Sequence, residues 1–265
     1  MNDYGKYFPP TQTKIRIFDL IKRLGLSRGI VRKWISKQWY KENIKLVDTI
    51  INGIKYRLNI LVNTTDMKIL TSSKFYDKTE IFQLANTHRK AVFVDIGANT
   101  GYYSLNLAKL GFSKIVAIEP NPPTLEILKY NIQINNYEEV ISVVNFGIGS
   151  GETIPFYCSG GLGDASMHKL DDVTEPIYVK TKSLLDVIKE QKIESIDALK
   201  IDIEGYEDKA LIPFFETASR KMWPKRVVIE DCHMSRWEQD IIEKMKNIGY
   251  KIIKKTRGNI ILECE

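Results

Sequence analysis

The sequence has few cysteines and no long apolar run. Its three cysteines, Cys158, Cys232 and Cys264, are widely spaced and form no CxxC pair. This spacing argues against a disulfide framework and a structural zinc site, and it is typical of a reducing compartment. The first ten residues lack an apolar signal core, and no stretch approaches the ~20 apolar residues that span a bilayer. We therefore expect a soluble, cytoplasmic protein.

Positive charge is concentrated in the first third of the chain. Residues 1–90 hold 18 Lys and Arg against 7 Asp and Glu, a balance of +11, whereas residues 91–265 hold 21 against 26, a balance of −5. Residues 14–41 alone carry nine basic residues and one acid. We expect two short helices there that contact an anionic membrane surface. The alternatives are contact with nucleic acid, which the acidic remainder disfavours, and apolar positions that pack on the catalytic domain or on a second copy in a homodimer.

The pattern of apolar residues divides the chain into two parts. Residues 1–90 form a basic N-terminal extension, in which Asn52-Gly53 between two β-rich runs predicts a hairpin and residues 66–70 and 80–85 favour helix. From residue 91, continuous apolar runs alternate with amphipathic segments, as in a parallel sheet covered by helices on both faces. We expect one Rossmann-like, doubly wound α/β domain over residues 91–265, whose tail forms an antiparallel hairpin. Its helices are expected at about 101–110, 123–135, 183–191, 206–217 and 235–247.

A glycine-rich stretch interrupts this alternation. Residues of about 149–181 have strand-like ends around Gly160-Gly161-Leu162-Gly163. Long connections within a compact domain are often functional. We therefore expect a flap beside the ligand crevice, in which His168 could contact a substrate.

The stretch from Val94 to Gly101, VDIGANTG, follows a strand and opens a helix. In open α/β sheets, ligands bind at the carboxyl ends of the strands, where the strand order reverses. Gly97 and Gly101 let the backbone approach a ligand and let the helix pack closely on the strand. The helix N-terminus would offer N–H groups to an anionic group of the ligand. Asp95 would anchor the loop or accept a hydrogen bond from a ligand ammonium.

Glu119 ends the next strand, 24 residues after Asp95. A carboxylate at this place can accept hydrogen bonds from both hydroxyls of a ribose, so it indicates an adenosine ligand. Nicotinamide-dependent oxidoreductases use the same interaction. However, Asn99 stands where a dinucleotide fingerprint prefers glycine, which leaves less room for a pyrophosphate. The alternative for Glu119 is an ordinary surface carboxylate at a strand end.

Acidic residues gather after the fourth and fifth main strands. In LKIDIEGYE these are Asp202, Glu204 and Glu207, and the next strand ends in Glu230 and Asp231, shortly before His233. His233 is the best-placed general base, with Glu204 and Glu230 as competitors, although it could instead be a structural histidine. Asp202 with Glu230 or Asp231 could hold Mg²⁺, or the acids could simply line the crevice. For Glu207 we favour capping of the following helix.

Together, VDIGANTGYYSL, IEPNP, ALKIDIEGYE and VVIED with His233 resemble the FkbM-type methyltransferases. The resemblance extends from about residue 45 to the end and leaves residues 1–42 outside. It implies a class I methyltransferase fold, S-adenosylmethionine as methyl donor and, in most cases, O-methylation of a hydroxyl on a sugar, glycolipid or polyketide. Carried over by position, the residues that would hold the cofactor are Asp95, Gly97, Asn99, Gly101 and Glu119, and Asp202 would line the site. We also expect Asn121, two residues after Glu119, at the cofactor.

On this basis the leading hypothesis is O-methylation of a glycan or glycolipid precursor. The alternatives are O-methylation of a small-molecule natural product, RNA methylation, a nicotinamide-dependent oxidoreductase and a non-catalytic membrane module. Asn121-Pro122-Pro123 resembles the NPP core of amino-directed nucleic-acid methyltransferases, but it follows the second strand rather than the fourth. It therefore does not support methylation of a nucleic-acid amine.

Overall fold

The computed structural model describes residues 3–7, 34, 37, 45–72, 77–86, 91–158, 165–166 and 176–264. Of the segment predicted to form two basic helices, only Trp34 and Lys37 belong to this set, and both are helical. The rest of that segment lies outside the described residues, as does the glycine-rich centre of the flap with His168. None of the helices within the described ranges is long and apolar enough to cross a bilayer.

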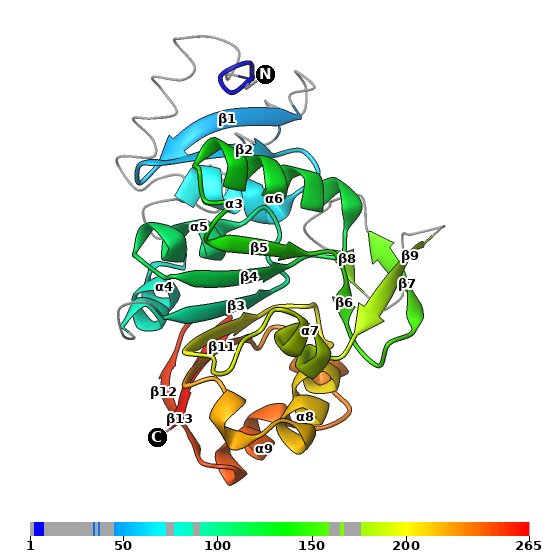
Figure 1. Cartoon of the computed structure of the whole chain (residues 1–265). Helices are drawn as coiled ribbons and strands as arrows, with labels where there is room; N and C mark the ends of the chain where they lie inside the picture. The colour runs from blue at the N-terminus through cyan, green and yellow to red at the C-terminus, as the bar shows by residue number, and fades with distance from the viewer. Residues whose placement is uncertain are drawn as a thin grey trace.

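A seven-stranded sheet, ordered β12-β13-β11-β10-β3-β4-β5, forms the centre of the molecule (Figure 1). Strands β5, β4, β3, β10 and β11 are parallel, and β13 joins β11 and β12 antiparallel. The chain proceeds from β3 through β4 to β5 and then returns to β10 on the other side of β3, so the strand order reverses between β3 and β10. This confirms the predicted Rossmann-like α/β fold with a terminal antiparallel hairpin. The strands are β3 (Val92–Ile96), β4 (Lys114–Ile118), β5 (Ile141–Val144), β10 (Ala198–Ile201), β11 (Arg226–Glu230), β12 (Tyr250–Lys255) and β13 (Asn259–Cys264).

Successive side chains of the central strands enter two different apolar cores. In β3, Phe93 belongs to the core beneath α4, α5 and α6, whereas Val94 and Ile96 belong to the core beneath α7, α8 and α9. A strand with both faces covered must be apolar throughout, which explains the continuous runs in the sequence. The helices are α4 (Lys78–Ala85), α5 (Tyr102–Lys109), α6 (Pro122–Ile134), α7 (Leu184–Glu190), α8 (Glu207–Thr217) and α9 (Ile241–Asn247).

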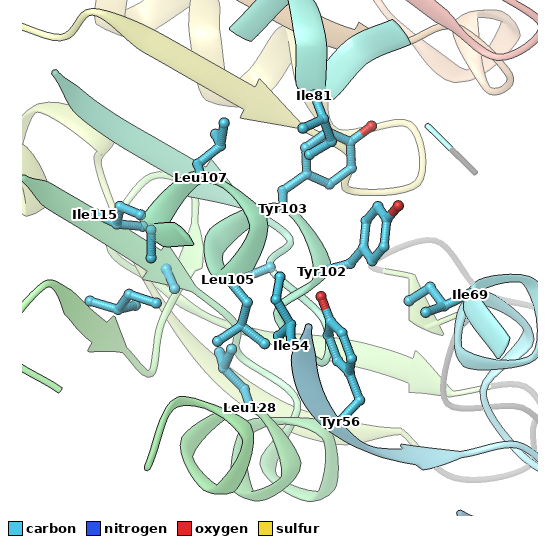
Figure 2. Packing of buried hydrophobic residues seen from close by; sticks show 14 of the residues in the cluster. Ile54, Tyr56, Ile69, Ile81, Tyr102, Tyr103, Leu105, Leu107, Ile115 and Leu128 are labelled. Carbon is cyan, nitrogen blue, oxygen red and sulfur yellow. The ribbon is translucent and has the colours of Figure 1, made fainter. Parts of the chain in front are cut away.

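The hairpin of β1 (Leu46–Ile51) and β2 (Ile54–Asn59) turns at Asn52-Gly53, as the sequence predicts. Both turn residues have positive φ, 51° and 73°, which a two-residue hairpin turn of type I′ requires. Tyr56 of β2 points into the same core as Leu105 and Leu128 (Figure 2). The helix α3 (Thr64–Ser72) follows the hairpin and contacts β2. Residues 46–72 therefore pack as part of the main core.

A second, four-stranded sheet projects beside the main one (Figure 1). The two strand-like ends of the predicted flap pair with each other as β7 and β9. Phe156 and Val179, one from each of these strands, are buried together against Tyr206. The sheet contains β6 (Gly147–Ile148), β7 (Thr153–Cys158), β8 (Ala165–Ser166) and β9 (Ile177–Lys182).

The helix predicted over residues 235–247 was wrong in its first half. The structure has a short 3-10 helix, η3 (Met234–Arg236), and α9 begins only at Ile241. The carboxylate of Asp208 accepts the backbone N–H groups of Glu238 and Gln239 at 2.9 and 3.2 Å. These N–H groups thus donate to a side chain that is distant in sequence and not to carbonyl groups of a helix. The Asp240 side chain then caps the start of α9.

Candidate cofactor and acceptor site

A pocket opens at the carboxyl ends of β3, β4 and β10, where the strand order reverses. It is bounded by the loop after β3 and by the loops after β4 and β10, and the flap contributes Phe156. This is the place at which the sequence predicted a ligand. Its lining consists of Thr65, Ile96, Gly97, Ala98, Asn99, Thr100, Tyr102, Tyr103, Ile118, Glu119, Pro120, Thr124, Phe146, Gly147, Ile148, Phe156, Lys200, Asp202, Ile203 and Glu204.

The two motif glycines, Gly97 and Gly101, allow close contacts in different parts of the structure. Gly97 lies in the pocket wall with φ 76°, and a Cβ there would come within 2.0 Å of the carbonyl oxygen of Asp202. Gly101 caps α5 with φ 95°, and its Cβ would lie 2.7 Å from a methyl group of Leu128 on α6. Gly97 therefore allows the β3 and β10 loops to cross, whereas Gly101 allows α5 and α6 to pack.

Asp95 is completely buried beneath the β3 loop and does not belong to the pocket lining. One carboxylate oxygen accepts from the backbone N–H and the hydroxyl of Ser104, at 3.1 and 2.6 Å. Burial raises the pKa of Asp95. Of the two roles that the sequence allows, this geometry agrees with anchoring of the loop and not with a contact to a ligand ammonium.

Glu119 lies in the pocket wall and is held there by two backbone groups. Its two carboxylate oxygens accept the N–H groups of Asn99 and Asn121, each at 2.9 Å. Burial raises the pKa of Glu119 to about 7, although these two N–H groups act in the opposite direction. The side chain of Asn121 itself is buried and does not belong to the lining. Glu119 is thus pre-oriented, and each oxygen keeps a lone pair for a ligand hydroxyl.

Helix α3 supports the β3 loop through polar contacts that sequence reasoning missed. The Asp66 carboxylate is fully buried and accepts from the Thr100 hydroxyl at 2.5 Å and from the Asn59 N–H at 2.7 Å. Asn63 donates to the side chain of Asn99 at 2.6 Å. Burial raises the pKa of Asp66 to about 7. The extension therefore positions the loop that forms the pocket.

Lys200 was also missed, although a lysine within the apolar strand ALKI was a usable signal. Its side chain is only 6% exposed and lies in the pocket wall, with Nζ 3.3 Å from Asp202 Oδ2 and 3.1 Å from the carbonyl oxygen of Gly97. Burial alone would lower the pKa of Lys200, but the nearby carboxylates of Asp202, Asp95 and Glu230 more than offset this, and the pKa is raised. Lys200 is therefore an ammonium at neutral pH.

His233 lies between two of the predicted acids. Its Nδ1 is 3.2 Å from Glu204 Oε2 and 3.3 Å from Glu230 Oε2. Burial, together with the carboxylates of Asp202 and Glu204, raises the pKa of Glu230 far above its usual range. The cluster can therefore hold and pass on a proton close to the pocket, which Glu204 and Asp202 line.

The same three side chains are arranged such that a cation could bind. The ligand atoms of Glu204, Glu230 and His233 lie within 4.8 Å of one another. Among the described residues, this is the group of acidic, His or Cys side chains that is close enough to hold a metal ion. Of the pairing expected from the sequence, Asp202 with Glu230 or Asp231, only Glu230 belongs to this set.

Glu207 has a structural role, as expected, but not as a simple helix cap. One oxygen accepts from the N–H groups of Ile203 and Gly205, and the other accepts from the Trp237 indole at 2.7 Å. Glu207 thereby fixes the loop that carries Glu204.

The model of the FkbM methyltransferase domain matches residues 95–252, more than half of the chain. The chain belongs to the FkbM methyltransferase family. This confirms the resemblance seen in the sequence, and the chain is therefore a methyltransferase. The model of the TRM5/TYW2 methyltransferase domain also matches, over residues 39–149.

Two proteins that are similar to this chain have names that describe different activities. Methyltransferase sdnD of Sordaria araneosa is 26% identical over 207 residues, which cover 65% of this chain and 78% of that protein. A tRNA(Phe) (4-demethylwyosine(37)-C(7)) aminocarboxypropyltransferase of Pyrococcus horikoshii is 33% identical over 95 residues, 36% of this chain and 31% of that protein.

Among solved structures, the tRNA (uracil-54, C5)-methyltransferase of Pyrococcus abyssi in complex with S-adenosyl-L-homocysteine aligns with a TM-score of 0.47 at 13% identity, covering 83% of this chain and 44% of that one.

Proposed function

We propose that the chain is an S-adenosylmethionine-dependent O-methyltransferase that methylates a sugar hydroxyl of a glycan or glycolipid precursor. Family membership supports methyl transfer. The observation that carries transfer to oxygen is the imidazole of His233 between Glu204 and Glu230, beside the pocket. A hydroxyl must lose its proton when it is methylated, and an imidazole in this position can accept that proton.

The pocket residues fit this cofactor. Glu119 can accept from the ribose hydroxyls, and the apolar side chains of Ile118 and Phe146 suit the adenine ring. Thr124 Oγ1 is buried and makes no hydrogen bond among the described residues, so it is available to a ligand. Asp202 supplies a carboxylate for the cofactor's ammonium. Asp95, Gly97, Asn99, Gly101 and Asn121 shape and brace this cradle.

The cofactor supplies an electrophilic methyl group on a positively charged sulfur. His233 would take the hydroxyl proton, and the Glu204 carboxylate beside it would stabilise the charge that forms on the ring. Glu204 and Glu230 are the competing bases. A divalent cation on these three residues is the alternative that we do not favour, because the imidazole already provides a proton acceptor.

We further propose that residues 91–265 constitute the cofactor-binding domain, with the flap at about 149–181 covering the acceptor. Residues 1–90 would form an extension that supports the pocket and provides contacts to the acceptor, to a membrane or to a second copy. A protein that is located at the cytoplasmic face of a membrane would meet lipid-linked glycans there.

RNA methylation is the second candidate, because the TRM5/TYW2 model matches residues 39–149. That match ends before Asp202, Glu204, Glu230 and His233, and it therefore covers the cofactor half of the site and not the proposed acceptor half. A small-molecule hydroxyl is a third possibility that the same chemistry allows. Nucleic acid is disfavoured by the acidic balance of residues 91–265.

Two measurements test the proposal. S-adenosylhomocysteine, and not NADH, should raise the melting temperature of the protein, because a ligand stabilises the state that binds it. Purified protein with isotope-labelled S-adenosylmethionine should then label a glycan or glycolipid fraction of the host, and the Glu119→Ala variant should not. Label in the RNA fraction alone, or stabilisation by NADH instead, would refute it. Mass spectrometry of glycans with and without the gene then identifies the methylated position.

A further inference from the structure

The amino-acid end of S-adenosylmethionine carries one positive and one negative charge. A pocket that binds it specifically needs an acid for the ammonium and a donor for the carboxylate. This inference rests on the proposed function, since it concerns how the same pocket holds its cofactor. The sequence allowed Asp95 either to anchor the loop or to accept from the ammonium, and it predicted the helix N-terminus after VDIGANTG for the carboxylate. In the structure, Asp95 is buried outside the pocket lining, and part of the α5 N-terminus is engaged in the protein's own hydrogen bonds.

Two backbone N–H groups at the N-terminus of α5 are engaged in the protein's own hydrogen bonds. The N–H of Gly101, the N-cap residue, donates to the Ala98 carbonyl at 2.9 Å. The N–H of Ser104, in the first turn, donates to the Asp95 carboxylate at 3.1 Å. The carboxylate of Asp95 thus takes up one of the N–H groups that a ligand carboxylate was expected to use.

Lys200 carries the positive charge that binding of the cofactor's carboxylate requires. It is the one cationic side chain among the residues that line the described pocket. An ammonium has three N–H donors, and the structure describes two oxygen partners, Gly97 and Asp202. One donor therefore remains for a ligand within the described part of the chain. Its position is fixed by burial and by the Tyr103 ring, whose centroid lies 5.4 Å from Nζ.

Lys200 and Asp202 together match both charges of the cofactor's amino-acid end. They are two residues apart at the end of β10, and their charged atoms are 3.3 Å apart. Glu119 follows β4, whereas Lys200 and Asp202 lie at the end of β10, on the other side of β3. An adenosine held by Glu119 and Thr124 would therefore leave the side at Lys200, Asp202 and Tyr103 for the amino-acid part. We propose that Lys200 binds the cofactor's carboxylate while Asp202 accepts from its ammonium.

Calorimetry with two ligands tests this proposal. S-adenosylhomocysteine carries the amino-acid end, whereas 5′-methylthioadenosine lacks it. Lys200→Met, which keeps an apolar stem and removes the charge, should weaken binding of S-adenosylhomocysteine by about tenfold or more, the loss expected for one charge-assisted hydrogen bond. Binding of 5′-methylthioadenosine should change by less than about twofold. Glu119→Gln is the matched control, because it should weaken both ligands alike.

The outcomes distinguish a failure of the proposed function from a failure of the role assigned to Lys200. If the wild-type protein binds neither ligand, the proposed function fails. If Lys200→Met weakens both ligands equally, or neither, Lys200 is a structural ion-pair partner and the proposal is wrong. Should Lys200→Met not fold, Lys200→Gln removes the charge and keeps a polar head group in the pocket wall. It should likewise lower the ratio of the two affinities while melting close to the wild type, and an unchanged ratio would overturn the assignment.

Discussion

The carboxylate of Glu119 accepts the backbone N–H of Asn99 at 2.9 Å, and it thereby joins two pocket loops that are 20 residues apart in the chain. The same side chain also accepts from the N–H of Asn121. The residue that we propose for ribose binding is therefore part of the framework that shapes the pocket. Substitution of Glu119 therefore has to be tested for its effect on ligand binding and for its effect on the folded structure.

Binding of S-adenosylhomocysteine should depend on Glu119 and on pH. Burial raises the pKa of Glu119 to about 7, so the free protein holds this group protonated below that pH. Two donating ribose hydroxyls favour the ionised form, and affinity should therefore rise with pH up to about 7 and then level off. Glu119→Ala should lower affinity at neutral pH by at least about tenfold. Calorimetry from pH 5.5 to 8.5 checks both statements, with circular dichroism as the test that the variant is folded. A flat profile in the wild type would contradict the role of Glu119.

Replacing His233 by Ala should lower turnover by about a hundredfold or more, because a general base contributes on that order. Affinity for S-adenosylhomocysteine should stay within about twofold, since this ring is not part of the pocket lining. The wild-type rate should fall at acidic pH, where a protonated imidazole cannot accept the proton. Full turnover of the variant with saturating acceptor would transfer the role to Glu204 or Glu230. Loss of wild-type activity with EDTA would instead indicate a cation on this cluster.

Gly97→Ala should abolish cofactor binding and destabilise the protein. A methyl group there meets the Asp202 carbonyl at 2.0 Å, and the positive φ adds strain. Gly111→Ala is the matched control, because Gly111 also has a positive φ but has no atom within 4 Å of the added Cβ. The control should lose only about 1–2 kcal/mol of unfolding free energy, the cost of the backbone strain, and should retain binding. Thermal denaturation and calorimetry compare the two, and equal losses would show that the contact with Asp202 is unimportant.

The stability of the protein should fall as the pH rises from about 4 to about 7, in part because of Asp66. Its pKa is near 3.8 when unfolded and about 7 in the folded protein, since it is buried. In that interval the folded state binds more protons than the unfolded state, so the free energy of unfolding falls by up to about 1.4 kcal/mol per pH unit. Asp66→Asn should reduce this slope, whereas Glu138→Gln, at an exposed position, should leave it unchanged. Denaturant unfolding at several pH values measures it, and identical slopes in both variants would exclude Asp66 as the source.

Residues 14–41 should bind anionic vesicles reversibly. The segment carries nine basic residues and one acid, and attraction amounts to about 1 kcal/mol per basic residue near such a surface. The full-length protein should sediment with anionic vesicles at low salt and be released at high salt. Changing three basic residues of this segment to Gln should weaken sedimentation. The same change at three exposed lysines of β12, Lys251, Lys254 and Lys255, should not. Protein that remains in solution at low salt would show that the segment has another role.

The main elements could be predicted from the sequence because their signals are local. Asn52-Gly53 has the composition of a type I′ turn, and the hairpin forms there. The apolar runs that end in Asp95 and Glu119 predicted two parallel strands, whose ends meet at one edge of the sheet. The helix over residues 235–247 was misplaced because its interruption depends on Asp208, which is about 30 residues away in sequence.

The sequence alone determined the fold and the position of the glycine-containing loop after β3, since periodicity, turn chemistry and strand ends are properties of short segments. Only the tertiary structure decided what each polar group does. Asp95 turns toward Ser104 and away from the pocket, and Lys200 lies in its wall beside Asp202. Such partners come from strands and helices that are far apart in the chain. Burial and charge at each group depend on all of its neighbours together, which no local pattern records.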